Sequence, residues 1–185
     1  MAISNTVTTP LLIRACHPKD IPTLTGLYAW HVENGTGTFE LDAPDARQMA
    51  SRLQQADEQG WPWLVAERAG QVIGYACAQP FRPRMAFRHC VEDSVYLAPD
   101  CQRQGIGRLL MAELIAQCEA RGATQMIAVI GDAANAGSIG LHHALGFEPA
   151  GQLSAVGWKF ARWLDVVLMQ RRLGFGAESA PRQKE

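Results

Sequence analysis

The chain has 185 residues, of which 48% are hydrophobic and 19% charged, a composition that predicts one compact globular domain. The 17 Lys and Arg residues balance 18 Asp and Glu residues to a formal net charge of -1, so no basic field is available to bind duplex nucleic acid. The apolar runs are too short for a membrane span, and the first residues lack the pattern of a secretion signal. We therefore expect a soluble cytoplasmic protein with no nucleic-acid or membrane partner.

The first half of the chain alternates short β-prone runs with amphipathic helical patterns. Polar residues or prolines that favour a helix start, and glycines that favour a helix end, mark the predicted boundaries. The segment Arg68-Ala69-Gly70-Gln71 between two apolar runs is typical of a β-hairpin turn. The predicted elements are, in order, a strand at 11–15, a helix from Asp20 to Asn34, a mostly polar helix from Asp42 or Pro44 to Gly60, and strands at 63–67 and 72–79.

The second half continues the alternation of strand and helix. Apolar residues at i, i+3 and i+4 predict a long helix between Gly105 and Gly122, and a shorter helix ends at Gly146. The predicted elements are a strand at 91–97, a helix at 105–121, a buried strand at 125–130, a helix at 135–145, one or two strands near 156–160 and a closing strand at 163–169. This order predicts a single α/β domain over residues 11–173, with flexible ends at 1–10 and 174–185.

The cysteines and histidines predict neither a disulfide framework nor a metal site. The five cysteines are widely spaced and include no C-x-x-C pair, so reduced thiols are expected. The five histidines include no H-E-x-x-H motif and no zinc-finger spacing. We therefore expect no bound metal.

The sharpest local feature is the segment Gln102-Arg103-Gln104-Gly105-Ile106-Gly107, between a predicted strand and the long helix. Two glycines let backbone N–H groups approach an anion closely, and the helix N-terminus favours negative charge, with Arg103 and Arg108 beside it. The spacing is that of neither a Rossmann fingerprint nor a P-loop. The segment predicts a pyrophosphate-binding loop, and a glycine turn without a ligand is the alternative.

Further motifs follow one another at regular intervals along residues 11–173. They are Pro80-Phe81-Arg82-x-Arg84, Val91-Glu92-x-Ser94-Val95-Tyr96, Asn135-x-x-Ser138-x-x-Leu141-His142, Leu145-Gly146-Phe147 and Val156-Gly157-x-Lys159-Phe160-x-Arg162-Trp163-Leu164-Asp165. Together with a loop of the form Q/R-x-x-G-x-G/A, they resemble the GNAT superfamily of acyl-CoA-dependent N-acetyltransferases. Within it, the chain is most similar to the phosphinothricin and methionine sulfoximine acetyltransferase family. Asp93, Cys101 and Ala161 depart from the family pattern.

The resemblance implies a GNAT fold, with a central mixed, twisted sheet flanked by helices and opened between the 91–97 and 125–130 strands to admit acetyl-CoA. The pantetheine arm of acetyl-CoA is then expected to pair with the backbone of that first strand like an added strand. The residues implied in acetyl-CoA binding are Val95, Tyr96, Leu97, Gln102, Arg103, Gln104, Gly105, Ile106, Gly107, Arg108, Asn135 and Ser138.

The chemistry of acetyl transfer requires a neutral amine, and a base must therefore remove a proton directly or through water. The resemblance implies Glu92 as this base and His142 as an acid, base or water-orienting group near the sulfur or the amine. The alternatives are a solvated carboxylate and a packed helical histidine. Direct transfer in a ternary complex is expected, and an acyl-cysteine intermediate is the rival route.

Two arginines predict an anionic substrate, since Arg82 and Arg84 suit bidentate binding of a carboxylate or phosphinate; a solvated basic surface is the alternative. Phe39 and Lys159 lie in segments that close the family's substrate pocket. The implied reaction is acetylation of the α-amino group of phosphinothricin, methionine sulfoximine, methionine sulfone or a related L-amino acid. Other small amines, protein or peptide amines, and a non-catalytic acetyl-CoA sensor are the alternatives. A homodimer is expected because the family is often dimeric and Trp158, Phe160 and Trp163 suit an interface.

Overall fold

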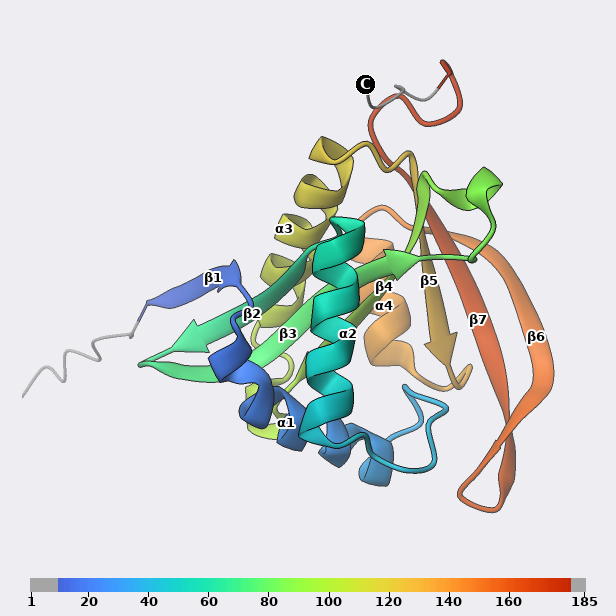
Figure 1. The fold of residues 1–185 in the computed structure, drawn as a ribbon. Coiled ribbons are helices and arrows are strands. Elements are labelled where there is room, and N and C mark those ends of the chain that lie inside the picture. Colours follow the sequence, from blue (N-terminus) through green and yellow to red (C-terminus); the bar gives the residue numbers. More distant parts are fainter. Residues whose placement is uncertain (1–9, 181–185) are drawn as a thin grey trace, which may run out of the picture.

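Residues 10–180 are described by the structure, a computed structural model, and their strands form one mixed sheet of seven in the order β1-β2-β3-β4-β5-β7-β6 (Figure 1). Neighbouring strands are antiparallel except β4 and β5, which are parallel. The strands are β1 (Leu11–Ala15), β2 (Trp63–Arg68), β3 (Gln71–Pro80), β4 (Cys90–Leu97), β5 (Gln125–Gly131), β6 (Glu148–Lys159) and β7 (Arg162–Arg172). The helices are α1 (Ile21–Asn34), α2 (Ala46–Gln59), α3 (Ile106–Ala120) and α4 (Ala136–Ala144), with 3-10 turns at Pro18–Asp20, Met85–Phe87 and Pro99–Cys101. The predicted α/β class and helix-flanked mixed sheet are confirmed.

The predicted hairpin between β2 and β3 forms as expected. Ala69 and Gly70 have φ angles of 52° and 76°, and two consecutive left-handed residues are the geometry that a two-residue hairpin turn requires. Gly122 and Gly146 also take left-handed backbone after α3 and α4, with φ of 92° and 80°.

The start of α2 differs from the prediction. The helix begins at Ala46, with Asp45 as N-cap in place of Asp42 or Pro44. The Asp45 side chain accepts a hydrogen bond from the Gln48 backbone N–H at 2.8 Å, and the Gln48 side chain accepts one from the Asp45 N–H at 2.8 Å. This reciprocal pair fixes the boundary three residues later than the earlier Asp42.

The strand near 156–160 is also longer than predicted, since β6 is one strand from Glu148 to Lys159. All but two of its residues are exposed, and its pairing with β7 is irregular between Leu153 and Gly157. A strand without a buried face carries no alternation of apolar and polar residues, which is why its first part escaped detection.

The structure describes only part of the two predicted flexible ends, 1–10 and 174–185. Residues 1–9 and 181–185 lie outside the described residues. Residues 174–180 form turns, in which the Gly176 N–H donates to the Leu173 carbonyl and Arg172 pairs with Glu178.

Helices cover both faces of the sheet (Figure 1), and one apolar core lies on each face. Helix α3 buries Leu110 and Leu114 against one face, where α4 also packs, and α1 and α2 bury Leu24 and Met49 against the other. Because side chains alternate along a strand, the odd-numbered residues of β4 face α3 and α4, while the even-numbered residues face α1 and α2. Within residues 10–180, no helix is long and apolar enough to cross a membrane.

The predicted opening of the sheet is present between β4 and β5. Their pairing runs only from Cys90 opposite Gln125 to Asp93 opposite Ala128, although β4 continues to Leu97 and β5 to Gly131. On their other edges, β4 remains paired with β3 and β5 with β7 as far as these ends. The two strands therefore separate after Asp93 and leave two facing backbone edges.

Candidate active site

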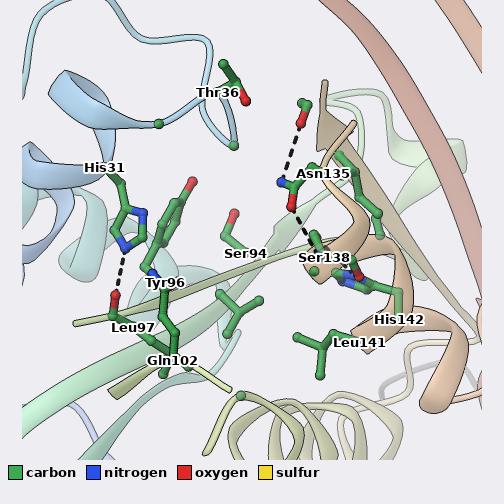
Figure 2. A pocket seen from close by; sticks show the side chains of 18 of the residues that line it. His31, Thr36, Ser94, Tyr96, Leu97, Gln102, Asn135, Ser138, Leu141 and His142 are labelled. Atoms are coloured by element: carbon green, nitrogen blue, oxygen red, sulfur yellow. Dashed lines mark hydrogen bonds between the residues drawn. The ribbon is translucent and has the colours of Figure 1, made fainter. Parts of the chain in front are cut away.

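A cavity of about 580 Å³ fills the opening between β4 and β5. The N-terminal ends of α3 and α4, the end of α1 and the loop after it complete its wall (Figure 2). The structure brings most of the predicted acetyl-CoA residues into this lining: Val95, Tyr96, Leu97, Gln102, Arg103, Gly105, Gly107, Arg108, Asn135 and Ser138. Gln104 and Ile106 do not line it. The Gln104 side chain is hydrogen-bonded to the Asp100 carbonyl and to Arg68, and Ile106 is buried in the core.

The glycine loop forms the end of the cavity next to α3. Arg103 and Gly105 both have left-handed backbone, with φ angles of 58° and 80°. At Gly105 a Cβ would meet no atom within 4 Å, so the backbone angle and not space favours glycine there. The loop leads directly into the first turn of α3, whose N–H groups and dipole attract an anion. This end of the cavity is therefore suited to a phosphate group, with Arg103 and Arg108 in the same wall.

The open edge of β4 presents alternate residues to the cavity. The Cys90 carbonyl accepts from Phe81 and the Ala98 N–H donates to Ile73, so the even-numbered residues of β4 direct their backbone groups to β3. The backbone groups of Val95 and Leu97 consequently face the opening, whereas those of Tyr96 do not. Among the three predicted pairing residues, Val95 and Leu97 offer the edge to which an extended ligand can add.

His31 contacts this edge from α1, and the sequence analysis missed it. Its Nε2–H donates to the Leu97 carbonyl at 2.8 Å, and its ring packs against Tyr96 with 5.2 Å between ring centroids (Figure 2). Burial lowers the pKa of His31 more than the hydrogen bond to Leu97 raises it, so the ring is neutral at pH 7. His31 thus ties the end of β4 to α1 as a neutral hydrogen-bond donor.

Asn135 lies on the opposite side of the cavity, at the start of α4 (Figure 2). Its Oδ1 accepts from the Ser138 N–H at 3.1 Å, which caps the helix, and its Nδ2 lies 3.5 Å from the Gly131 carbonyl at the end of β5. The side chain therefore joins α4 to the diverging end of β5.

His142 is buried on α4 and uses both ring nitrogens within the protein. Nδ1 lies 2.8 Å from the Ser138 carbonyl, and Nε2 lies 2.9 Å from Oδ2 of Asp93 on β4. The His142 and Asp93 side chains are 3% and 2% exposed, and both residues line the cavity. Burial alone lowers the pKa of His142, but the hydrogen bond and negative charge of Asp93, with the Ser138 carbonyl, bring it above its ordinary value.

Asp93 has no assigned role in the sequence analysis, where it is only a departure from the family pattern. Two signals were available: it is adjacent to Glu92, and strand alternation directs it to the opposite face of β4, toward the helix that carries His142. The register that brings these two side chains together is set by the fold and was not visible in the sequence.

Glu92 lies on the α1 and α2 face of β4, opposite Gln79 of β3, and does not line the cavity. It is half-buried. Burial raises the pKa of Glu92, the negative charge of Asp93 raises it further, and the nearby Arg82 lowers it by a smaller amount. The structure therefore brings Arg82 close to Glu92. Arg82 is exposed, with its guanidinium 4.2 Å from the ring centre of Phe81, and Arg84 is exposed beside it.

Phe39 lies in the loop after α1 and Lys159 bonds to that loop, and neither residue lines the cavity. The buried Lys159 donates from Nζ to the Thr38 carbonyl at 2.9 Å, and burial lowers the pKa of its ammonium group. The Phe39 ring lies over Gly157 and Gly131, where an added Cβ would approach ring carbons to 2.0 and 3.1 Å. The two residues thus hold this loop against β5 and β6.

Comparisons with known proteins agree with this geometry. The model of the acetyltransferase (GNAT) family matches residues 24–147. The chain is 48% identical over 169 residues to phosphinothricin N-acetyltransferase from Alcaligenes faecalis, which covers 91% of this chain and 86% of that protein. It is 40% identical over 162 residues to L-methionine sulfoximine/L-methionine sulfone acetyltransferase from Pseudomonas paraeruginosa, covering 87% and 94%. The crystal structure of a GNAT superfamily phosphinothricin acetyltransferase from Sinorhizobium meliloti, in complex with AcCoA, aligns with a TM-score of 0.91 at 44% identity and covers 94% of each chain.

Proposed function

The chain belongs to the acetyltransferase (GNAT) family and is an N-acetyltransferase, and from this premise we propose that it acetylates the α-amino group of phosphinothricin, methionine sulfoximine, methionine sulfone or a related L-amino acid. The observation that carries the proposal is the cavity between β4 and β5. It combines a phosphate-binding loop at one end with an open strand edge along its side. Acetyl-CoA, a pyrophosphate attached to an extended amide-containing arm, suits both features.

Direct transfer in a ternary complex is the route that the residues favour. The five cysteines all lie within the described residues, none of them lines the cavity, and burial raises the pKa of each thiol. A thiolate able to accept the acetyl group is therefore not available at the site. The amine nitrogen attacks the thioester carbonyl carbon, the new C–N bond forms, the C–S bond breaks, and CoA leaves as its thiolate.

We propose Glu92 as the base that takes the proton of the substrate amine, directly or through water. Its half-burial and raised pKa bring it closer to neutrality than an exposed carboxylate, as a base working near pH 7 requires. The position of Glu92 on the face of β4 away from α3 implies that the amine approaches from the side of α1 and α2.

The substrate preference is proposed from charge. The exposed guanidinium of Arg82 lies close enough to Glu92 to lower its pKa, so one substrate can have its acidic group near Arg82 and its amine near Glu92. An α-amino acid with a carboxylate and a phosphinate or sulfoximine group has this arrangement, whereas polyamines and basic peptides do not. Arg84, Phe39 and Lys159 are proposed to shape the same pocket.

A homodimer is also proposed, with the hairpin of β6 and β7 in the interface. The hairpin extends beyond the helices (Figure 1), and Trp158, Phe160 and Trp163 are 54%, 51% and 62% exposed along it. Adjacent exposed aromatic side chains favour association with another protein surface. Light scattering after gel filtration tests this, and Trp158→Ser together with Trp163→Ser is expected to shift a dimer toward monomer.

The test of the activity is release of free CoA thiol from acetyl-CoA with a panel of amines. The panel holds L-phosphinothricin, L-methionine sulfoximine, L-methionine sulfone, spermidine, an aminoglycoside and a basic peptide. Selective turnover of the first three is expected. Turnover of the cationic amines alone would contradict the anionic pocket, and acetyl-CoA binding without any turnover would favour a sensor.

A further inference from the structure

The pair of Asp93 and His142 lacks the full set of hydrogen bonds that a buried ion pair needs to stabilise a fold. Oδ2 of Asp93 accepts from His142, but Oδ1 is buried and has no hydrogen-bond partner among residues 10–180. Removing two charges from water is unfavourable unless the remaining lone pairs are also satisfied. The pair therefore calls for an explanation other than stability.

The hydrogen bonds of His142 are compatible with two protonation states. A carbonyl oxygen only accepts, so Nδ1 carries a proton in both states. Nε2 either donates a second proton to an ionised Asp93 or accepts the proton of a neutral Asp93, and the raised pKa of His142 favours the first state, an imidazolium with both N–H groups engaged. The Phe147 ring packs against it in a T-shaped arrangement with 4.9 Å between ring centroids, and the Ser138 hydroxyl lies 3.3 Å from Nδ1.

The other titratable groups near the pair do not supply a competing positive charge. Cys118 on α3 lies on the Asp93 face of the sheet and Cys77 on β3 lies on the opposite face, and burial raises the pKa of both thiols, so they remain neutral. Glu92, the neighbour of Asp93 on β4, adds a negative charge from the opposite face of the sheet. The hydrogen bond and negative charge of Asp93 therefore favour the protonated state of His142.

The pair lies at the inner end of the cavity. Asp93 is the last residue of β4 that pairs with β5, so it marks the point where the two strands separate. The phosphate-binding loop is at the other end, beyond Leu97, and the four steps along the strand from Leu97 back to Asp93 span about 13 Å. A ligand whose phosphates occupy the loop and whose arm follows β4 has its far end beside Asp93 and His142.

We propose that Asp93 is a positioning residue for acetyl transfer, which holds His142 protonated and fixed at the inner end of the cavity so that its charge, and not its proton, serves the reaction. This inference rests on the proposed acetyltransferase function. Attack by the amine places negative charge first on the thioester oxygen and then on the leaving sulfur, and a fixed positive charge nearby stabilises both. The amine proton goes to Glu92, and His142 keeps both of its own throughout.

The first test uses the wild-type protein and needs no turnover. Long-range ¹H–¹⁵N NMR of labelled histidines, with His142 assigned by the loss of its signals in His142→Gln, reports which ring nitrogens carry protons. Both nitrogens of His142 are expected to be protonated at about pH 8, where an ordinary histidine is neutral. An unprotonated Nε2 at that pH would overturn the proposal, whatever the enzyme acetylates.

The second test is a cycle of Asp93→Asn, His142→Gln and the double variant, assayed with the amine that the wild type turns over best. Asp93→Asn is expected to lower kcat by about tenfold or more, while KM for acetyl-CoA changes little. The ratio of its kcat to that of the wild type is expected to fall as pH rises, because His142 without the carboxylate loses its proton. Since Asp93 acts through His142, the double variant is expected to be no slower than His142→Gln alone.

Asp20→Asn is the matched control, because Asp20 is another buried, ion-paired carboxylate and lies away from the cavity. It is expected to lose stability and to keep the wild-type pH profile of kcat. A wild-type pH profile in Asp93→Asn, or additive losses in the double variant, would assign Asp93 a merely structural role. Failure of the wild type to acetylate any amine would reject the proposed function and leave the NMR test of the pair standing.

Discussion

Two buried carboxylates, on side chains that are 5% exposed in Asp20 and 2% exposed in Asp93, have opposite hydrogen-bonding environments. Both Asp20 oxygens accept from the guanidinium of Arg14, at 2.9 and 2.7 Å, and one accepts also from the His17 N–H at 2.8 Å. Arg14 in turn pairs with Glu67 at 2.7 Å. Asp93, by contrast, has one oxygen bonded to His142 and the other without a partner among residues 10–180.

The difference separates a part of the sheet that is fully hydrogen-bonded from a part that lines the candidate active site. The Asp20 network joins β1, β2 and the turn before α1, where the sheet is continuously paired. The Asp93 pair lies where pairing stops and a cavity begins. A buried charge with satisfied lone pairs is consistent with a structural role, and one left half-satisfied beside a cavity points to function.

The largest effect is expected from Glu92→Gln, the neighbour of Asp93 on β4. If Glu92 is the base, the variant loses turnover by about a hundredfold or more, because an amide cannot accept the amine proton. The free energy of unfolding is expected to change little, since the side chain is only half-buried. Steady-state kinetics together with acetyl-CoA titration measure this, and unchanged turnover would remove Glu92 from the mechanism.

Asp20→Asn is expected to lower the free energy of unfolding by about 3 kcal/mol, because it leaves the half-buried Arg14 without the charge of its buried partner. Urea denaturation at neutral pH measures the loss. An equal or larger loss of stability in Asp93→Asn would break the distinction between the two carboxylates.

The contributions of Asp20 and His142 to stability are expected to depend on pH in opposite directions. Arg14 lowers the pKa of Asp20 in the folded protein against the opposing effect of burial, so its contribution is present above the unfolded value of about 3.9 and is lost as pH falls through the folded pKa. The pKa of His142 is raised, so its contribution is complete below about 6.5 and is lost as pH rises through the folded pKa.

Denaturation of the wild type, Asp20→Asn and His142→Gln over a range of pH tests these opposite windows. The difference between wild type and Asp20→Asn is expected to stay constant near neutrality and to shrink only in acid. The difference between wild type and His142→Gln is expected to shrink on the alkaline side. If both stability differences shrank in acid, or both on the alkaline side, the charges assigned to Asp20 and His142 would be wrong.

A smaller effect is expected from Arg82→Gln, which removes the proposed partner of the substrate's acidic group. KM for the amino-acid substrate is expected to rise about tenfold, and KM for acetyl-CoA to stay within error. Arg88→Gln is the matched control, because Arg88 is an exposed arginine on the same loop whose guanidinium bonds to the Met85 carbonyl. An equal rise for both variants would indicate a diffuse effect of surface charge.

The parts of the fold and of the site that depend on local contacts could be predicted from the sequence. The glycine loop at 102–107 is contiguous, and strands with one buried face show their periodicity, so both were predicted. The exposed strand β6 has no such periodicity. The pairs of Asp93 with His142 and of His31 with Leu97 join residues 49 and 66 positions apart, and a single sequence does not encode which distant side chains meet.

The smallest effect is expected from His31, which fixes the end of the open β4 edge. His31→Ala removes the donor to the Leu97 carbonyl, and the loss of one hydrogen bond, about 1 kcal/mol, predicts about fivefold weaker acetyl-CoA binding with kcat unchanged. His31→Gln keeps an N–H donor and is expected to recover part of the affinity. Calorimetric titration with acetyl-CoA distinguishes the two causes: equal losses in both variants would mean that ring packing against Trp30 and Tyr96, and not the hydrogen bond, holds this edge in place.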